Sequence, residues 1–328
     1  MKVAVIGAGA WGTALASVAA ENEHDVVMWA REEHVVHEIN TLHTNNNFLP
    51  DVTLAGSIRA THSIDDVHGA DVTIIATPTQ FIRSVLTSQV KFFSSTTIVN
   101  VAKGIEIGTQ LRVSQLVEDV GVTPRDYVVV SGPSHAEEVV RRMPTTVVAA
   151  SSNIEAAQRI QTVLSTETFR VYTSADVVGV EICGALKNVI AIAAGIVDGI
   201  GFGDNTKAAL ITRGLAEIAR LGVALGAHQQ TFFGLAGLGD LFVTCASVHS
   251  RNRYVGEQIG KGKSLSSILD GMSAVAEGVS TTKAALELSA FVGVELPIAS
   301  KVSSIIFDGE DPKDAIRELM MRPMKNEE

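Results

Sequence analysis

The sequence predicts an α/β protein in which a doubly wound, mostly parallel sheet is followed by an all-helical C-terminal domain. In the first half, short runs rich in Val and Ile alternate with amphipathic segments, which is the pattern of repeated strand–helix–strand units. After about Thr173 the strand-like runs stop, and long segments rich in Ala and Leu follow. The chain has 328 residues, and single cores stop growing at roughly 250–300 residues. We therefore expect two domains, residues 1–175 and 176–328.

The strands expected in the first half are short and apolar, as strands buried on both faces of a parallel sheet are. In chain order they are Lys2–Ile6, Asp25–Trp29, Asp71–Ala76, Thr96–Asn100, Tyr127–Ser131, Thr145–Ala150 and Phe169–Tyr172. The amphipathic segments between them predict helices at Thr13–Glu23, Glu32–Thr41, Gln80–Val90, Leu111–Val120 and Ile154–Leu164. Helices of this length are typical connections between parallel strands.

Apolar residues at helical spacing continue through the second half and predict an all-helical domain. The helices are expected at Val177–Val197, Thr206–Leu225, Leu265–Asp270, Val279–Val292 and Asp314–Met321. Ser264 precedes one of these segments and Asp311-Pro312 precedes another, and both are residue types that begin helices. No linker rich in Pro or Ser separates the two halves, so we expect a tight junction.

The composition argues against some classes of function. The formal net charge of −10 lacks the basic footprint of nonspecific nucleic-acid binding, so we expect no nucleic-acid partner. Cys183 and Cys245 lie in apolar surroundings without a CxxC pair, which predicts reduced, buried thiols and a cytoplasmic location. No uninterrupted apolar run approaches the roughly 18–20 residues that span a bilayer. We expect a soluble protein that is not inserted in a membrane.

The segment Gly7-Ala8-Gly9-Ala10-Trp11-Gly12 follows the first expected strand and opens a helix. In a dinucleotide-binding fold the first glycine allows a tight turn and the second lets the backbone approach the pyrophosphate, while the third allows the helix to pack closely on the strand. The helix N-terminus then offers free amides to phosphates. A purely structural turn is the alternative. The position between a strand and a helix favours a cofactor site in a Rossmann-type sheet.

The choice of cofactor depends on the end of the second strand. An acid there accepts from the ribose hydroxyls of NAD, whereas an arginine favours the 2′-phosphate of NADP. Arg31 follows this strand, and no acid stands on the strand end itself, which favours NADP(H). Glu32 is adjacent and leaves NAD(H) possible. The alternative for Arg31 is a solvated charge at the start of a helix.

Two turns at the expected carboxyl edge of the sheet carry polar residues. Ser134 and Glu137, after one strand, fit a capping box, which explains the pair without any ligand. The amides of the same turn also suit an anion, because α/β folds bind ligands at this edge. Lys103 follows the preceding strand, and we favour a role in a site over a role at the surface.

Lys187 is the only charge between Glu181 and Asp198 in a long apolar segment. Burying an ammonium is costly unless a partner compensates it, and desolvation lowers the pKa of a lysine toward the range useful for proton transfer. Asp240, isolated in a glycine-rich apolar stretch, is the expected partner. The alternatives are a lysine that extends its amine to solvent from the rim of the helix and an aspartate that caps a helix over Leu241–Ala246.

Ser250-Arg251-Asn252 combines a guanidinium with a hydroxyl and an amide just before a helix, which suits a phosphate because the guanidinium fork matches phosphate oxygens. A cluster of ordinary surface residues is the alternative. The nine histidines include no HExxH motif or Cys/His ligand spacing, so no metal is expected. A GxSxG nucleophile turn is also absent from the sequence.

Together these segments resemble the NAD(P)-dependent glycerol-3-phosphate dehydrogenases of the soluble bacterial type, over nearly the whole chain. The resemblance rests on the order and spacing of Gly7–Gly12, Lys103–Glu106, Ser131–Ser134, Gly184–Asn188, Leu210–Gly214, Gly237–Asp240, Ser250–Arg253 and Val275–Gly278. It implies reduction of dihydroxyacetone phosphate to sn-glycerol 3-phosphate, which supplies the backbone of phospholipids. It also makes a homodimer plausible. Ala10 departs from the Ser of many relatives, and several relatives carry His in place of Arg31.

The motifs and the resemblance together assign roles to individual residues. The cofactor contacts are Gly7, Gly9, Trp11, Gly12, Arg31, Lys103, Ala136, Arg251 and Glu277. The substrate contacts are Lys103, Gly132, Ser134, Lys187, Asn188, Asp240, Ser250, Arg251 and Asn252. Lys187 matches the catalytic base, and Asp240 and Lys103 complete the expected catalytic group.

Two other kinds of protein could carry some of these features. β-Hydroxyacid dehydrogenases and ketopantoate reductases also combine a Rossmann-type half with a helical half that holds a catalytic lysine. The block Ser250–Arg253 argues against their unphosphorylated substrates. A dinucleotide-sensing protein without turnover would keep Gly7–Gly12 but would have little reason to bury Lys187.

Overall fold

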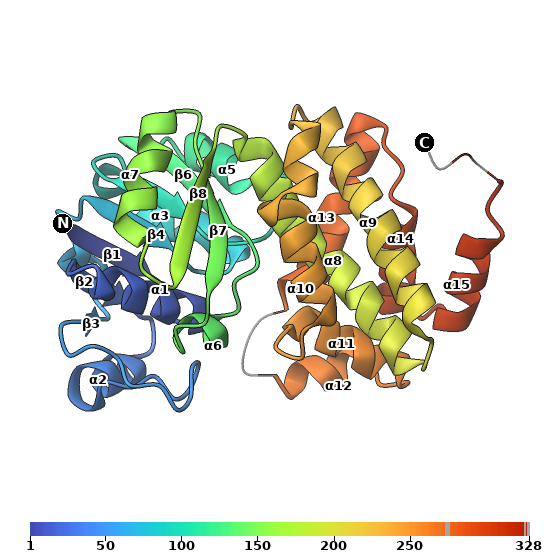
Figure 1. Ribbon diagram of the computed structural model, residues 1–328, viewed down its shortest axis with the longest axis horizontal. Helices are drawn as coiled ribbons and strands as arrows, with labels where there is room; N and C mark the ends of the chain where they lie inside the picture. The colour runs from blue at the N-terminus through green and yellow to red at the C-terminus, as the bar shows by residue number, and fades with distance from the viewer. Residues whose placement is uncertain (273–275, 325, 327–328) are drawn as a thin grey trace.

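The computed structural model describes residues 1–272, 276–324 and 326. Figure 1 shows two parts side by side, a sheet with flanking helices formed by the first half and a group of helices formed by the second half. The expected fold class, a Rossmann-type sheet followed by a helical C-terminal part, is confirmed. Val275, which belongs to one block of the family resemblance, lies outside the described residues.

Within the described residues, eight strands form one sheet in the order β3-β2-β1-β4-β5-β6-β7-β8. Neighbouring strands are parallel except for β6 and β7, which are antiparallel. The strands span Lys2–Ile6 (β1), Asp25–Trp29 (β2), Arg59–Thr61 (β3), Val72–Ile75 (β4), Thr97–Asn100 (β5), Asp126–Ser131 (β6), Thr145–Ala150 (β7) and Phe169–Ser174 (β8). Every strand expected from the sequence is present, with small shifts at some ends.

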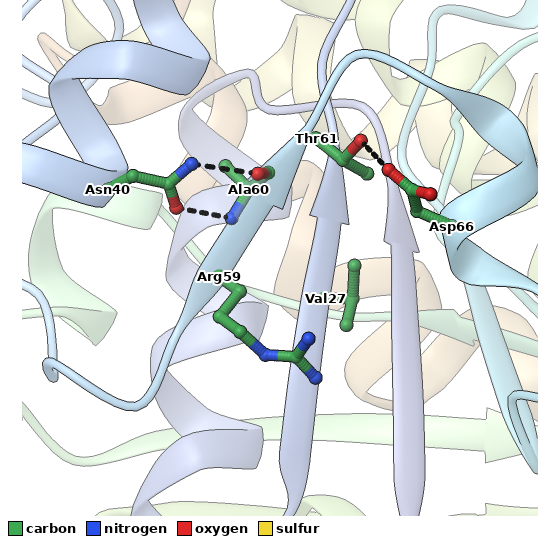
Figure 2. Close-up of a pocket in the computed structure, with 6 residues that line it drawn as sticks. All are labelled: Val27, Asn40, Arg59, Ala60, Thr61 and Asp66. Carbon is green, nitrogen blue, oxygen red and sulfur yellow. Dashed lines mark hydrogen bonds between the residues drawn. The ribbon is translucent and has the colours of Figure 1, made fainter.

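Strand β3 was not predicted. It has only three residues, Arg59–Thr61, and only Ala60 is buried, so no apolar run marks it. Asn40 of α2 (Glu33–Leu42) covers its outer edge: Nδ2 donates to the Ala60 carbonyl oxygen over 2.9 Å, and the Ala60 N–H donates to Oδ1 over 2.8 Å (Figure 2). A side chain thus takes the place of a further strand. The pocket beside this edge, about 440 Å³, shares none of its described lining residues with the cleft considered below.

Helices cover both faces of the sheet, as a doubly wound fold requires. They are α1 (Ala10–Glu21), α2, α3 (Thr79–Ser88), α4 (Val90–Phe93), α5 (Val113–Asp119), α6 (Ala136–Val139) and α7 (Ile154–Leu164). Alternation along β1 separates the two apolar layers. Val3 and Val5 pack in the layer with α1 and α7, whereas Ala4 and Ile6 pack in the layer with α3 and α5.

The second half is helical, with α8 at the centre of its core. Its helices are α8 (Val177–Gly199), α9 (Asp204–Ala224), α10 (Asp240–Ala246), α11 (Arg251–Gly260), α12 (Leu265–Asp270), α13 (Glu277–Val292), α14 (Pro297–Ser303) and α15 (Pro312–Met320). Ser264 and Asp311 cap α12 and α15 through their side chains, as expected. By length and composition α8 could cross a membrane, but its most apolar window is wholly buried inside the protein. Such burial is typical of a core helix.

The bounds of α11 were not predicted, because its sequence is polar and contains two glycines, which are poor helix formers. Glycines on both helices permit α11 to cross α8 closely. A Cβ on Gly256 would lie 1.9 Å from the carbonyl oxygen of Ile192, and a Cβ on Gly195 would lie 1.9 Å from the carbonyl oxygen of Arg253. No side chain fits between the two backbones, so the start of α11 is held against the middle of α8.

Candidate active site

A cleft of about 740 Å³ lies between the sheet and the helical part. Most of the residues expected at a site line it, namely Gly7, Gly9, Trp11, Arg31, Lys103, Ser134, Ala136, Lys187, Asn188, Ser250, Arg251, Asn252 and Glu277. Gly12, Gly132 and Asp240 are not lining residues, but each contacts a residue that is. The structure therefore brings the whole predicted set to one place.

The glycine-rich turn before α1 has the geometry that its spacing predicts. Gly7 has φ +112°, which L side chains rarely adopt. A Cβ on Gly12 would lie 2.0 Å from the Gly7 carbonyl oxygen, so helix and strand pack as closely as glycine allows. A Cβ on Gly9 would meet nothing within 4 Å, and this residue faces the cleft. Gly9 also leaves α1 without a side-chain cap. This turn fits the pyrophosphate of a dinucleotide.

Three polar side-chain atoms in the wall of the cleft are buried and have no hydrogen-bond partner in the described part of the chain. They are Trp11 Nε1, Thr77 Oγ1 and His135 Nε2. Buried polar groups are normally paired, so these atoms fit a polar ligand in the cleft. Neither Thr77 nor His135 was expected at the site from the sequence. Both follow a strand at the carboxyl edge of the sheet, and that position is the signal that could have found them.

Arg31 and Glu32 stand after β2 and both line the cleft. The Arg31 guanidinium donates to Glu32 Oε1 over 2.6 Å from Nη2 and over 2.9 Å from Nε. The Arg31 side chain is 77% exposed, and exposed ion pairs contribute only about 0–1 kcal/mol. The guanidinium can therefore turn from Glu32 to a phosphate at little cost. The two residues on which the expected choice between NADP and NAD rests therefore both line the cleft.

Lys187 lies in the middle of α8 and is buried, with 6% of its surface exposed. Its ammonium donates to Asp240 Oδ1 and, over 2.8 Å, to Thr244 Oγ1. Asp240 and Thr244 stand one turn apart on α10. The expected ion pair is confirmed, and the solvent-directed lysine is wrong. The helix-capping aspartate is also wrong, because the N-cap of α10 is Gly239, and Asp240, the first residue of the helix, directs its carboxylate to the lysine.

Lys103, in the segment after β5, is a second cation beside Asp240. Its Nζ donates to Asp240 Oδ2 over 2.8 Å and to the Gly132 carbonyl oxygen over 3.3 Å. Ser131 Oγ donates to the same carboxylate oxygen over 3.2 Å. One carboxylate thus compensates two ammonium groups, which leaves a positive charge that suits an anionic substrate. The sequence placed Lys103 at this edge but did not predict its bond to Asp240.

The environment of Lys187 changes its proton affinity. Burial lowers the pKa of Lys187 from 10.5 to about 7; the Asp240 carboxylate opposes this shift, and the Lys103 ammonium adds to it. Burial raises the pKa of Asp240, but the ammonium groups of Lys103 and Lys187 outweigh burial and hold that pKa below its usual value. A lysine whose pKa is near 7 can give and take a proton at neutral pH, which is the property of a general acid–base catalyst.

Amide side chains connect the segment of Lys103 to the start of α11. Asn188 Nδ2 donates to the Lys103 carbonyl oxygen over 3.1 Å, and Asn252 Nδ2 donates to Asn188 Oδ1 over 2.9 Å. Ser250 caps α11 through its side chain, and Arg251 follows it, exposed and lining the cleft. The close crossing of α8 and α11 therefore brings the candidate phosphate-binding residues to the lysine.

The capping box expected from Ser134 and Glu137 is wrong. The N-cap of α6 is His135, and Ser134 Oγ donates instead to the Gly132 carbonyl oxygen over 2.8 Å. Gly132 has φ +147°, and a Cβ there would lie 2.9 Å from the Cα of Val147, so only glycine fits. This turn bends the chain after β6 and presents Ser134 and His135 to the cleft.

Two family models match the chain. NAD-dependent glycerol-3-phosphate dehydrogenase N-terminus covers residues 2–157, and NAD-dependent glycerol-3-phosphate dehydrogenase C-terminus covers residues 176–317. The chain belongs to the NAD-dependent glycerol-3-phosphate dehydrogenase family. The recognition made from the sequence is confirmed, and with it the expectation of an oxidoreductase that uses a nicotinamide cofactor.

Individual relatives agree with this membership. The glycerol-3-phosphate dehydrogenase [NAD(P)+] of Geobacillus kaustophilus is 53% identical over 333 residues, covering 99% of this chain and 96% of that protein. The crystal structure of glycerol-3-phosphate dehydrogenase from Coxiella burnetii has a TM-score of 0.94 at 35% identity, covering 98% and 99% of the two chains. A ketopantoate reductase from Ralstonia eutropha, with a TM-score of 0.62 at 14% identity, covering 96% of this chain and 100% of that one, shares the fold alone.

Proposed function

We propose that this member of the glycerol-3-phosphate dehydrogenase family reduces dihydroxyacetone phosphate to sn-glycerol 3-phosphate and so supplies glycerophospholipid synthesis. The observation that carries the proposal is Lys187. It is a buried amine with a pKa lowered to about 7, and it lines the same cleft as a glycine-rich turn that fits a dinucleotide. Membership of the family supports the identity of the substrate.

The reaction adds a hydride and a proton to one carbonyl group, and a nicotinamide cofactor, when bound, would supply the hydride for C2. Lys187, as an ammonium, donates a hydrogen bond to the carbonyl oxygen and then gives its proton to the developing alkoxide. In the reverse direction the neutral amine of Lys187 removes the hydroxyl proton. Asp240 orients the amine, and Lys103 adds positive charge on the other side of Asp240. General acid–base catalysis of this kind contributes about 10²–10⁴ in rate.

One spectrophotometric assay distinguishes this function from those of the other two-domain dehydrogenases and of a sensing protein. Purified protein is mixed with NADPH and dihydroxyacetone phosphate, and the nicotinamide absorbance is followed over time. We expect the absorbance to fall, and much more slowly with unphosphorylated dihydroxyacetone or with ketopantoate. Oxidation driven only by an unphosphorylated keto acid would favour the other two-domain dehydrogenases. Cofactor binding without any turnover would favour a sensing protein.

The phosphate of the substrate is assigned to Ser250, Arg251 and Asn252 at the start of α11. We expect Arg251→Ala to raise the KM for dihydroxyacetone phosphate by about ten- to a hundredfold, because one charged hydrogen-bonding group is lost. The cofactor affinity should change less than this KM. Steady-state kinetics with unphosphorylated dihydroxyacetone provide the control, since that substrate has no phosphate to lose. Equal losses with both substrates would contradict the assignment.

The preference for NADP(H) rests on Arg31, with NAD(H) possible through Glu32. Repeating the assay with NADH measures this preference directly, and Arg31→Ala should weaken NADPH binding more than NADH binding.

We further propose that residues 1–175 bind the cofactor and that residues 176–328 carry the catalytic lysine. A cytoplasmic homodimer agrees with the buried, free cysteines and with the largely apolar helical half. Light scattering of the purified protein measures the oligomeric state.

A further inference from the structure

Thr79 and Glu277 join the two halves of the chain beside the cleft. Glu277 Oε1 accepts hydrogen bonds from the Thr79 backbone N–H and from Thr79 Oγ1, both over 2.9 Å. Thr79 is the first residue of α3 and is buried, and the N-cap of that helix, Pro78, has no side-chain acceptor to offer. Glu277, the first residue of α13, therefore caps a helix of the other half. It also lines the cleft.

This bond is one link in a ring of contacts around the active site. Next to Glu277, the Gly278 N–H donates to Asn252 Oδ1 over 2.9 Å. Asn252 in turn donates to Asn188, which donates to the Lys103 carbonyl oxygen. The ring thus connects Glu277 to the catalytic group through the substrate side of the cleft.

The ring closes between the segment after Lys103 and Thr79. A Cβ on Gly104 would lie 2.6 Å from Thr79 Oγ1 and 3.4 Å from Glu277 Oε1. Glycine is therefore required for this segment to approach the Thr79 hydroxyl. Because the hydroxyl is packed on one side by Gly104 and bonded on the other to Glu277, it has little freedom to turn.

We propose that Thr79 is a positioning residue that fixes the Glu277 carboxylate at the cofactor end of the cleft. Two donors from one buried residue converge on a single oxygen, so the carboxylate has one preferred orientation. The backbone of Glu277 is held separately, through Gly278 and Asn252. Removal of the Thr79 hydroxyl therefore takes away one of the two donors that orient the carboxylate, while the backbone N–H bond and the contact through Gly278 remain. The inference rests on the proposed function, because it assigns Glu277 to the nicotinamide cofactor.

The test is a fluorescence titration of the full-length protein with NADPH. Thr79→Val keeps the shape of the side chain and the backbone N–H but lacks the hydroxyl donor. We expect its dissociation constant for NADPH to rise on the order of tenfold, and we expect Thr79→Ser to restore the wild-type value. Thr87→Val is the matched control, because Thr87 lies exposed on the same helix and its hydroxyl donates to the Arg83 carbonyl oxygen over 2.8 Å. This control should bind NADPH like the wild type.

A double-mutant cycle separates positioning from a general effect on folding. In a Glu277→Ala background, Thr79→Val should lose most of its effect on NADPH affinity, because the carboxylate that it orients is absent. Equal effects in the two backgrounds, or a wild-type dissociation constant for Thr79→Val, overturn the inference while leaving the proposed function intact. A wild-type protein that binds neither NADPH nor NADH overturns both.

Discussion

Glu181 and Lys187 are two buried charges on the same helix, α8, and their surroundings differ. The Glu181 carboxylate accepts from Arg112 Nη1, from the Ser114 N–H and Oγ, and from Tyr127 Oη, all over 2.6–2.8 Å. Lys187 shares a single counter-ion with Lys103 and donates otherwise to one hydroxyl.

The two charges differ in how completely they are compensated. Donors from α5 and β6 surround the Glu181 carboxylate, which therefore holds α8 against the sheet; Glu181 does not line the described cleft. Lys187 lines that cleft, and burial together with the neighbouring Lys103 ammonium lowers its pKa despite the Asp240 carboxylate, so its proton can leave. Burial alone therefore does not distinguish a catalytic charge from a structural one. We propose that incomplete compensation beside open space makes this distinction.

The largest effect is expected from Lys187, the charge proposed to be catalytic. Lys187→Ala should lower kcat by about 10²–10⁴, the usual contribution of a general acid–base catalyst, and it should leave NADPH binding in place. Lys187→Met, which keeps most of the side-chain length, controls for the cavity that alanine creates. A Lys187 variant with near-normal kcat in the dihydroxyacetone phosphate assay would show that Lys187, like Glu181, is not a catalytic charge.

Substitution of Glu181 should affect stability and not kcat. Glu181→Ala should lower the free energy of unfolding by about 3–5 kcal/mol, because it leaves the guanidinium of Arg112 without its buried partner. The kcat of the folded fraction should stay close to that of the wild type. Urea denaturation measures the first quantity and active-site titration with kinetics the second. Glu181→Gln keeps an acceptor at this position and should cost less. A large loss of kcat without a loss of stability would place Glu181 in the catalytic group.

Much of the fold could be predicted because strands buried on both faces are continuous apolar runs, as in Lys2–Ile6. The sequence pattern did not predict an element where a contact with another part of the chain stabilises it. Strand β3 has one buried residue and depends on Asn40 at its edge. Helix α11 contains Gly256, and glycine in a sequence argues against a helix. Its role becomes clear only from its close packing on the backbone of α8. No single segment carries this information.

The same limit applies to the site. Lys187 and Asp240 could be predicted as partners because each is an isolated charge in an apolar stretch. Thr79 and Thr244 could not, because a threonine is common on any helix and only its contact across the chain gives it a role. Only the capping role expected for Ser134 was wrong, since the local capping pattern is indistinguishable from a turn held by Gly132.

A smaller effect is expected on the pH profiles of kcat/KM. Because the pKa of Lys187 in the folded protein is about 7, kcat/KM for oxidation of glycerol 3-phosphate should rise through that pH, and kcat/KM for the reduction should fall. Measurements above pH 6.5 reduce the contribution of the second ionisation of a phosphate monoester, which occurs at about pH 6. Lys103→Met removes a repelling ammonium and leaves Asp240 to Lys187 alone, so both profiles should move to higher pH. Profiles that do not move would show that Lys103 does not tune the proton affinity of Lys187.

The same pKa has a consequence for stability, and its sign is fixed. Between pH 7 and 10.5 the unfolded chain keeps the proton of Lys187 while the folded chain has released it. The unfolded state then binds more protons, so the free energy of unfolding gains a contribution that grows as the pH rises through this window. Below pH 7 both states are protonated and the full cost of the buried ammonium remains. Lys187→Met should flatten this part of the stability profile, whereas Glu181→Gln should leave its slope unchanged. A wild-type profile without this slope would mean that the buried ammonium is as well compensated as Glu181.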